Sequence, residues 1–323
     1  MDKHLPVHVL VNPASQSGAG LKIWEKVRER LRAEGVQPEV HMSDAQHSLF
    51  VLAEQVTAAG EELTLLMLGG DGSMNEVLCG IKDPDKVILG YIPTGSSNDF
   101  ARAIGQNSVD SALETIIHSE KPVQRDLGEL TYLDPETGKE KKRYFNVSAG
   151  LGFDAAACEA ANRSSFKKLF NRLHLGKIIY LFAAVRLILT SRLNPFEIEW
   201  TEQDPQTGQS RKQLLKLDRT LFAVCMNHGY EGGGFLFCPD ADAGDGKLDL
   251  CAAYDISRLR FLQMFPLAYD GSHVGHKGVE IRQASSFTLR TAVPCWFHVD
   301  GEVPGKTACM TANVLPGKLK MWN

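Results

Sequence analysis

The sequence predicts a two-part fold: a doubly wound α/β half with a mostly parallel sheet, followed by an antiparallel β-sandwich half. Up to about residue 122, apolar runs of strand length alternate with runs of helical period, which is typical of a parallel sheet covered by helices. Beyond that point, short strand-like runs follow one another between turn-rich loops, as in a sandwich or barrel. We therefore place domains at residues 1–124 and 125–309, and a last strand, about 310–323, could return to the first domain.

In the first domain, the strands are expected to be buried and the helices amphipathic. The helix at 21–31, for example, has apolar residues at Leu21, Trp24, Val27 and Leu31 and is stopped near Gly35. The run 14–20, rich in serine and glycine, is expected to be flexible. The predicted strands are 7–11, 36–42, 63–68 and 87–92, and the predicted helices are 21–31, 49–59, 100–104 and 109–117.

In the second domain, the runs 123–133 and 143–147 are separated by the turn-rich stretch 134–138, which predicts a hairpin. The further predicted strands are 196–201, 220–226, 247–253, 279–282, 286–290, 296–299 and 309–315.

Composition limits the function classes. The net charge of −4 argues against a dedicated nucleic-acid binder. The seven cysteines lie far apart without a CxxC pair, so we expect no disulfide framework or cysteine zinc site, and a reducing cytoplasm fits. No apolar run reaches the length of a membrane-spanning helix. The histidines are scattered, with no HxxxH or HExxH spacing, so none is proposed as a metal ligand.

Three loops with glycine and small polar residues each follow a predicted strand, at residues 12–20, 69–76 and 93–99. The carboxyl ends of parallel strands are where ligands bind in open α/β sheets. In the middle loop, three glycines and a helix start suit a phosphate, because the N–H groups of a helix start point at one place. The Asp71 carboxylate would repel a phosphate unless a Mg²⁺ lay between them, so Asp71 is either a metal-organising residue or a helix cap. The convergence of three such loops favours a ligand site.

Two later stretches carry carboxylates. Asp300 and Glu302 share one face of a strand end, where one could act as a general base; a surface turn is the alternative. The oxygen-rich run 239–249 suits Mg²⁺ or Ca²⁺, or is simply a solvated hairpin loop. Asp126 stands at the domain boundary and is expected to face the cleft.

The segment 163–196 contains lysines, arginines and apolar residues but no acidic residue. Such a segment suits an interfacial contact with a membrane, in which basic side chains meet anionic headgroups. The alternative is a helix packed on the sandwich with a solvated basic face.

Six motifs occur in order along the chain: VNP at 11–13 with its Ser/Gly loop, GGDGS at 69–73 with NE at 75–76, PTGSSNDF at 93–100, DLG at 126–128, NVSAGLG at 146–152 and DGE at 300–302. On these motifs the chain resembles the diacylglycerol kinase catalytic-domain family, in particular its soluble bacterial lipid kinases. The two departures are Ser73 and Ser96, which stand where the family usually has threonine, and each keeps a hydroxyl.

The resemblance implies an ATP- and Mg²⁺-dependent kinase that phosphorylates a lipid hydroxyl, with diacylglycerol as the family default, at a site in the interdomain cleft. It implies that Asp71, Asp99 and Asp126 organise the catalytic Mg²⁺, and that Asp300 or Glu302 is the base. A second, structural divalent cation (Mg²⁺ or Ca²⁺) would be bound by Asp242, Asp245 and the Lys247 carbonyl. The implied ATP-site residues are Asn12, Pro13, Ala14, Ser15, Gln16, Ser43, Gly69, Gly70, Asp71, Gly72, Ser73, Met74, Asn75, Glu76, Gly95, Ser96 and Asn98.

Other functions share parts of this pattern. An NAD kinase has GGDG with an Asn-Glu pair, a 6-phosphofructokinase has GGDGS, and a catalytically silent nucleotide- or lipid-binding protein could keep the fold. The NDF and DGE signatures and the basic apolar segment favour the lipid kinase. We expect a cytoplasmic protein that binds the membrane peripherally; the lipid acceptor stays open, and a homodimer would be unsurprising.

Overall fold

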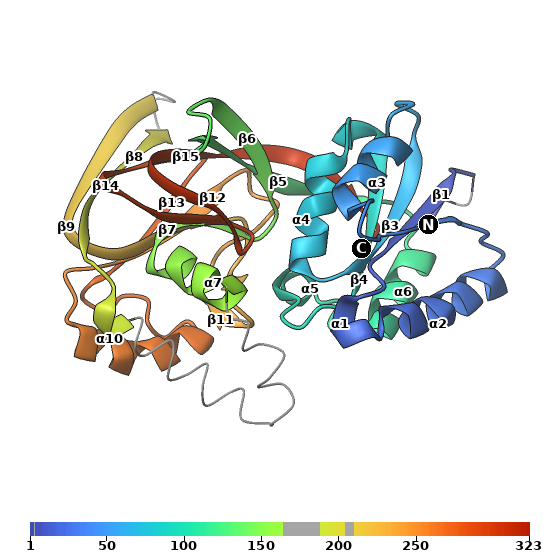
Figure 1. The fold of residues 1–323 in the computed structure, drawn as a ribbon, viewed down its shortest axis with the longest axis horizontal. Coiled ribbons are helices and arrows are strands. Elements are labelled where there is room, and N and C mark those ends of the chain that lie inside the picture. The colour runs from blue at the N-terminus through green and yellow to red at the C-terminus, as the bar shows by residue number, and fades with distance from the viewer. Residues whose placement is uncertain (3, 164–187, 204–209) are drawn as a thin grey trace.

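The computed structural model, which describes residues 1–2, 4–163, 188–203 and 210–323, has the two halves that the sequence predicts (Figure 1). The first half is a sheet covered by helices, and the second is built mainly from antiparallel strands. The predicted fold class is therefore confirmed. Within the described part of the chain, no helix has the length and apolarity needed to cross a membrane.

The first half is a parallel sheet with helices on both faces. Its strands are β1 (Val7–Val11), β2 (Glu39–Met42), β3 (Leu63–Gly69) and β4 (Val87–Pro93), in the order β4-β3-β1-β2. Every residue of β3 is buried, because helices cover it on both sides. The helices are α1 (Ser15–Gly18), α2 (Gly20–Ala33), α3 (Leu49–Val56), α4 (Asp71–Gly80), α5 (Asp99–Ala103) and α6 (Val109–His118), with a 3₁₀ turn η1 (Pro84–Lys86).

The flexible loop predicted for residues 14–20 is wrong: this run forms α1 and the start of α2. Gly20 explains why the helix packs directly on the end of β1. A Cβ at this position would lie 2.3 Å from the Asn12 carbonyl oxygen, so only glycine fits there.

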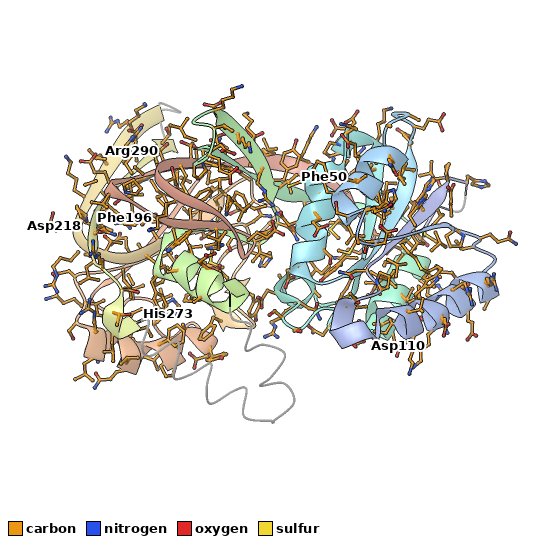
Figure 2. The ribbon with its side chains drawn as sticks, in the orientation of Figure 1. Phe50, Asp110, Phe196, Asp218, His273 and Arg290 are labelled. Carbon is orange, nitrogen blue, oxygen red and sulfur yellow. The ribbon has the colours of Figure 1, made fainter. Side chains whose placement is uncertain are left out.

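The second half encloses a core of large apolar side chains between antiparallel strands. Figure 2 shows Phe196 within this half, whereas Asp218 and Arg290 lie on its surface. Its strands are β5 (Val123–Leu133), β6 (Glu140–Phe145), β7 (Ser148–Gly152), β8 (Asn194–Gln203), β9 (Ser210–Met226), β10 (Tyr230–Glu231), β11 (Phe235–Leu236), β12 (Leu248–Tyr254), β13 (Val279–Ala284), β14 (Ser286–Val299) and β15 (Glu302–Met321). Its helices are α7 (Phe153–Arg163) and α10 (Arg258–Met264), with a 3₁₀ turn η2 (Phe265–Tyr269).

The two strands predicted at 286–290 and 296–299 are a single strand, β14. Pro294 indicates a break in the sequence, but β14 carries it where the pairing with β15 is irregular, between Arg290 and Cys295. A proline is tolerated at such an irregularity, because no ladder hydrogen bond is required there.

The last strand, β15, belongs to both halves. It pairs antiparallel with β14 and β5, and its end pairs in parallel with β4, where Lys320 lies beside Ile88. Trp322 is buried in the core of the first half, and its indole N–H donates to Thr64 Oγ1 at 3.2 Å. The strand therefore joins the two halves into one 13-stranded sheet.

Candidate active site

The loops that follow β1, β3 and β4 touch one another at the carboxyl edge of the sheet. Asn12 Nδ2 donates to Ser73 Oγ at 3.1 Å, which joins the first loop to the second. Gly70 and Gly95 join the second loop to the third: a Cβ on Gly95 would lie 2.5 Å from the Gly70 Cα. The two backbones approach this closely only because both residues are glycine.

Asp71 begins α4 but caps a different helix. Its Oδ2 accepts the backbone N–H of Asp99 at 3.0 Å, and its Oδ1 accepts that of Phe100 at 3.2 Å, so it occupies the N-terminus of α5. Burial raises the pKa of Asp71, although these N–H groups oppose the shift. The capping interpretation and the ligand interpretation of this residue are therefore compatible, because the same carboxylate also faces a pocket.

A pocket of about 370 Å³ lies between the two halves. Its first-half lining is Gly70, Asp71, Gly72, Ser96, Ser97 and Asp99. Its second-half lining is Val147, Ser148, Cys158, Glu231, Gly232, Asp300 and Gly301. The structure thus brings together predicted residues that are more than two hundred positions apart in the chain.

Asp300 is the polar junction of the two halves. Its Oδ1 accepts the backbone N–H groups of Val147 and Ser148. Its Oδ2 accepts the backbone N–H of Asn146 and the side-chain N–H of Asn75, and all four distances are 2.9 Å. Burial raises the pKa of Asp300, and these donors oppose the shift. With two N–H donors on each oxygen, no position is left for an acid proton, so the carboxylate is the form that fits this site.

Glu302, the other proposed base, lies to the side of this pocket. It pairs with Arg143 at 2.8 Å and is 43% exposed. Arg143 also donates to Asn75 Oδ1 at 2.7 Å, and Glu76 accepts the N–H of Leu49 at the start of α3. The predicted ATP-site residues Asn75 and Glu76 thus both make contacts within the protein.

Asp126 does not line the pocket. Its two carboxylate oxygens accept the N–H groups of Gly246 at 2.7 Å and Gly317 at 2.8 Å. It therefore holds the loop that contains the predicted cation ligands. In that loop, the exposed Asp245 accepts from Lys247 N–H and from Gln283, both at 2.9 Å.

The remaining predicted ATP-site residues surround the three loops. Ser15 Oγ accepts the hydroxyl of Thr94 at 3.0 Å, and Asn98 Oδ1 accepts Gly95 N–H at 2.8 Å. The N–H of Ser43 donates to the Val11 carbonyl at 3.0 Å, at the end of β1. Met74 points into the core and is fully buried, so only its backbone could meet a ligand. Pro13, Ala14, Gln16 and Gly69 belong to the same loops.

Sequence reasoning missed a buried polar network behind the pocket. His298 is fully buried, and its Nε2 lies 2.9 Å from Asp154 Oδ2 and 3.3 Å from Glu231 Oε1. A Cβ on Gly150 would lie 2.2 Å from that Asp154 oxygen, so a glycine of the NVSAGLG motif makes room for the pair. The acid beside three glycines, at 231–234, was the signal that could have revealed Glu231.

Two residues of this network, Glu231 and His298, have raised pKa values. Burial raises the pKa of Glu231 to about 7, and the neighbouring Asp154 adds to the shift. Burial lowers the pKa of His298, but the two carboxylates raise it more, to about 9. The N–H of Gly301, 3.4 Å from Nδ1, is a weak opposing contact. The structure thus shows a buried network in which one histidine contacts two carboxylates.

The donor set of the pocket fits a hard divalent cation. Four carboxylates line it, those of Asp71, Asp99, Glu231 and Asp300. The oxygens of Asp71 and Asp300 already accept N–H groups, so Asp99 and Glu231 are the two with an oxygen left for a cation. Asp99 Oδ1 is buried and has no hydrogen-bond partner among the described residues. Burial raises the pKa of Asp99, with Asp71 adding to the shift. Oxygen ligands of this kind are those that Mg²⁺ prefers.

Two family models match successive parts of the chain. The diacylglycerol kinase catalytic domain matches residues 6–130, and the YegS C-terminal NAD kinase beta sandwich-like domain matches residues 146–323. A diacylglycerol kinase of Mycobacterium tuberculosis is 31% identical over 312 residues, covering 93% of this chain and 85% of its own. A diacylglycerol kinase of Staphylococcus saprophyticus is 26% identical and covers 92% of this chain and 89% of its own.

Solved structures show the same fold. A diacylglycerol kinase from Bacillus anthracis covers 98% of this chain and 96% of its own, with a TM-score of 0.64 and 18% identity. Another solved structure from that organism, described as a putative diacylglycerol kinase, reaches a TM-score of 0.72 at 20% identity, over 99% of this chain and 96% of its own. Because a diacylglycerol kinase that is 31% identical covers 93% of its length, and the diacylglycerol kinase catalytic domain matches residues 6–130, this chain belongs to the diacylglycerol kinase family.

Proposed function

We propose that the chain is a lipid kinase that transfers the γ-phosphoryl group of ATP to a lipid hydroxyl, with diacylglycerol as acceptor. The observation that carries this proposal is the pocket between the halves, in which glycine-rich loops face carboxylates from the second half. Phosphoryl transfer needs mainly positioning and charge neutralisation, and this lining offers both. Family membership supports the same reaction class.

The first half supplies the phosphate side. A Cβ built on Gly72 meets nothing within 4 Å, so the backbone at the start of α4 is open to a ligand. The N–H groups at that helix start favour a negative charge. We assign the ATP phosphates to this surface, with Asn12, Ser73 and Ser96 beside it.

Asp99, whose Oδ1 has no hydrogen-bond partner among the described residues, would hold the Mg²⁺, which would supply neutralisation of the phosphate charge. Both oxygens of Asp71 already accept N–H groups, so this residue orients the site chiefly through its neighbours. Asp126 would act at a distance, by holding the 242–247 loop against the end of β15. In that loop we retain Asp242, Asp245 and the Lys247 carbonyl as ligands of a structural cation.

In the transfer, the acceptor oxygen bonds to the γ-phosphorus, the bond to the β-phosphate oxygen breaks, and the acceptor proton passes to a carboxylate. Two carboxylates on the second-half side of the pocket are candidates. Asp300 has the position that the resemblance assigns to the base, but its oxygens are fully used by N–H donors. Glu231 has a buried Oε2 without a hydrogen-bond partner among the described residues. Glu302 is the third candidate, outside the lining.

Peripheral binding to the membrane is part of the proposal because the acceptor is a lipid. The basic apolar segment 163–196 is the proposed contact; residues 164–187 lie outside the described residues, so the support comes from the sequence alone. Reversing the charges of Lys167, Lys168 and Arg172 should weaken binding to anionic vesicles. Unchanged binding would exclude this segment as the contact.

The reaction itself is tested with labelled ATP, Mg²⁺ and a panel of lipids in mixed micelles, with NAD as a soluble acceptor. We expect labelled phosphatidic acid from diacylglycerol, lost in Asp71→Ala and kept in Asp110→Ala. Asp110 is an exposed acid on α6 (Figure 2) and is not part of the pocket lining. Labelling of NAD alone would refute the lipid acceptor. Labelling of no acceptor would favour a silent binding protein.

A further inference from the structure

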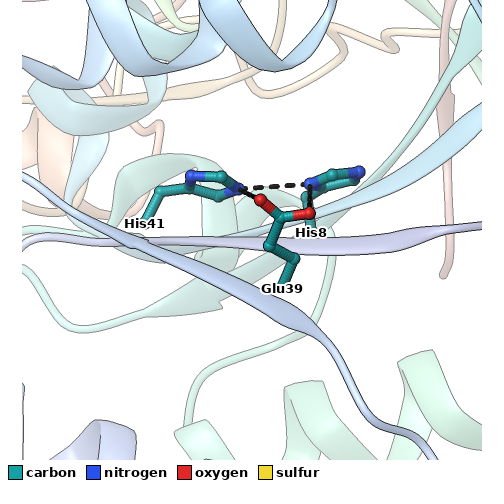
Figure 3. A group of neighbouring side chains, drawn as sticks. All are labelled: His8, Glu39 and His41. Atoms are coloured by element: carbon teal, nitrogen blue, oxygen red, sulfur yellow. Dashed lines mark hydrogen bonds and ion pairs between the residues drawn. The ribbon is translucent and has the colours of Figure 1, made fainter.

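Three side chains with metal-binding atoms meet on the outer strands of the first-half sheet, away from the pocket. In the parallel pair β1–β2, His8 lies beside Glu39, and His41 is two residues further along β2. Alternate residues of a strand share a face, so Glu39 and His41 point to the same side. Figure 3 shows the Glu39 carboxylate between the two imidazole rings, with one oxygen toward each ring.

The distances suit a single bound ion. His8 Nδ1 lies 3.2 Å from His41 Nε2, and the two Glu39 oxygens lie 3.8 Å and 3.7 Å from these nitrogens. Ligand atoms about 2.0–2.1 Å from a tetrahedral zinc ion are about 3.3–3.4 Å from one another. The triangle needs only a small approach by Glu39, whose side chain is 68% exposed and free to move.

A hydrogen bond between the rings explains only part of this arrangement. One N–H···N bond would account for the 3.2 Å contact. It would not account for Glu39, whose two oxygens face the ring nitrogens from beyond hydrogen-bond distance but within ion-pair distance, so that a proton on one ring is the alternative to a bound ion. A cation bound within the triangle would explain the orientations of all three side chains.

We propose that His8, Glu39 and His41 bind a divalent transition-metal ion, with Zn²⁺ as the best match. Two imidazole nitrogens and one carboxylate select zinc and its neighbours over Mg²⁺ and Ca²⁺, which prefer all-oxygen sites. The site is accessible because β2 is the outermost strand of the sheet. The ion would fasten β2 to β1, and a fourth position stays open to water or another ligand.

The test is zinc titration of the full chain after chelator treatment, with excess Mg²⁺ present to occupy all-oxygen sites. Calorimetry gives the stoichiometry, and Co²⁺ absorption reports tetrahedral nitrogen and oxygen coordination. We expect a zinc ion in wild type whose affinity falls at least about a hundredfold in His41→Gln, since loss of outer partners alone costs about 10–100-fold. Zinc should also raise the melting temperature of wild type but not of His41→Gln.

The matched control is His118→Gln, which removes an exposed histidine from α6 and should bind zinc as wild type does. Glu39→Gln is the second variant, because this exposed side chain can be changed without disturbing the core. Equal zinc isotherms and equal melting shifts in wild type, His41→Gln and Glu39→Gln would overturn the proposal. That result would leave an inter-ring hydrogen bond as the whole function of the cluster.

Discussion

Replacing Asp300 by asparagine tests whether this residue joins the two halves as a carboxylate. The two side chains have nearly the same shape, so the change alters charge and hydrogen bonding with little effect on packing. In wild type, each carboxylate oxygen accepts two N–H groups. In the variant, an NH₂ group must replace one oxygen, and two of those donors then face another donor.

The expected loss of folding stability follows from the hydrogen bonds that are lost. A hydrogen bond to a charged group contributes about 1.5–3 kcal/mol, and a buried donor without a partner costs about 1–3 kcal/mol. With two bonds lost in a site where Asp300 is 9% exposed, we expect a loss of about 3–5 kcal/mol. For a chain of this size, each kcal/mol lowers the melting temperature by about 2 °C. Asp300→Asn should therefore melt about 6–10 °C below wild type.

Thermal unfolding followed by circular dichroism at pH 7 measures this shift. Glu302→Gln is the matched control: its ion pair with Arg143 is 43% exposed on the glutamate side and contributes less than about 1 kcal/mol. If Asp300→Asn melts within about 2 °C of the Glu302→Gln protein, the carboxylate does not hold the halves together, and Asp300 is protonated in the folded chain. Lost activity without lost stability would then assign Asp300 to the chemistry alone.

Three further predictions follow from the geometry. Gly72→Ala should keep the wild-type melting temperature, because its Cβ enters open space, but should weaken ATP binding, measured with a fluorescent nucleotide. Gly95→Ala should lower both the melting temperature and the affinity for ATP, because its Cβ would lie 2.5 Å from Gly70 Cα. Burial raises the pKa of Glu231 to about 7, so if Glu231 is the base, kcat/KM should rise with pH up to about 7 and Glu231→Gln should lose that limb; an unchanged profile would exclude it. The pKa of His298 is lowered by burial but raised more by its carboxylates, from 6.5 to about 9, so its contribution to stability is complete below about 6.5 and is lost as pH rises through 9. The melting temperature of His298→Gln should consequently fall less than that of wild type between pH 7 and about 9.5, and parallel curves would refute the charged form.

Local patterns in the sequence predicted most strands of both halves and most helices of the first half, but not α1, α7, α10 or the continuity of β14. Strand and helix periods depend on which face a residue presents, and this face repeats every two or 3.6 residues whatever packs against it. The glycine loops after β3 and β4 could be located because carboxyl ends of parallel strands share one edge. The absence of a disulfide framework was also predictable, and all seven cysteines are free.

Contacts between distant segments were decided only by the tertiary structure. The sequence placed Asp300 near a cleft, but nothing local indicates that residues 146–148 and Asn75 would fill its hydrogen bonds. The same holds for Asp126, which local reasoning directed to the cleft and which instead binds two loop amides.

The histidines are the clearest example of contacts that local sequence patterns do not predict. Motifs such as HxxxH detect ligands on one helix, whereas His8 and His41 meet through the pairing of two parallel strands. His298 is brought to Asp154 and Glu231 by segments from three parts of the chain. The secondary structure of a segment can be predicted from the spacing of its apolar residues. The tertiary contacts of a side chain depend instead on strand register and on the packing of the two halves. The sequence by itself therefore determined most of the elements and the family motifs, and the fold decided which charges meet.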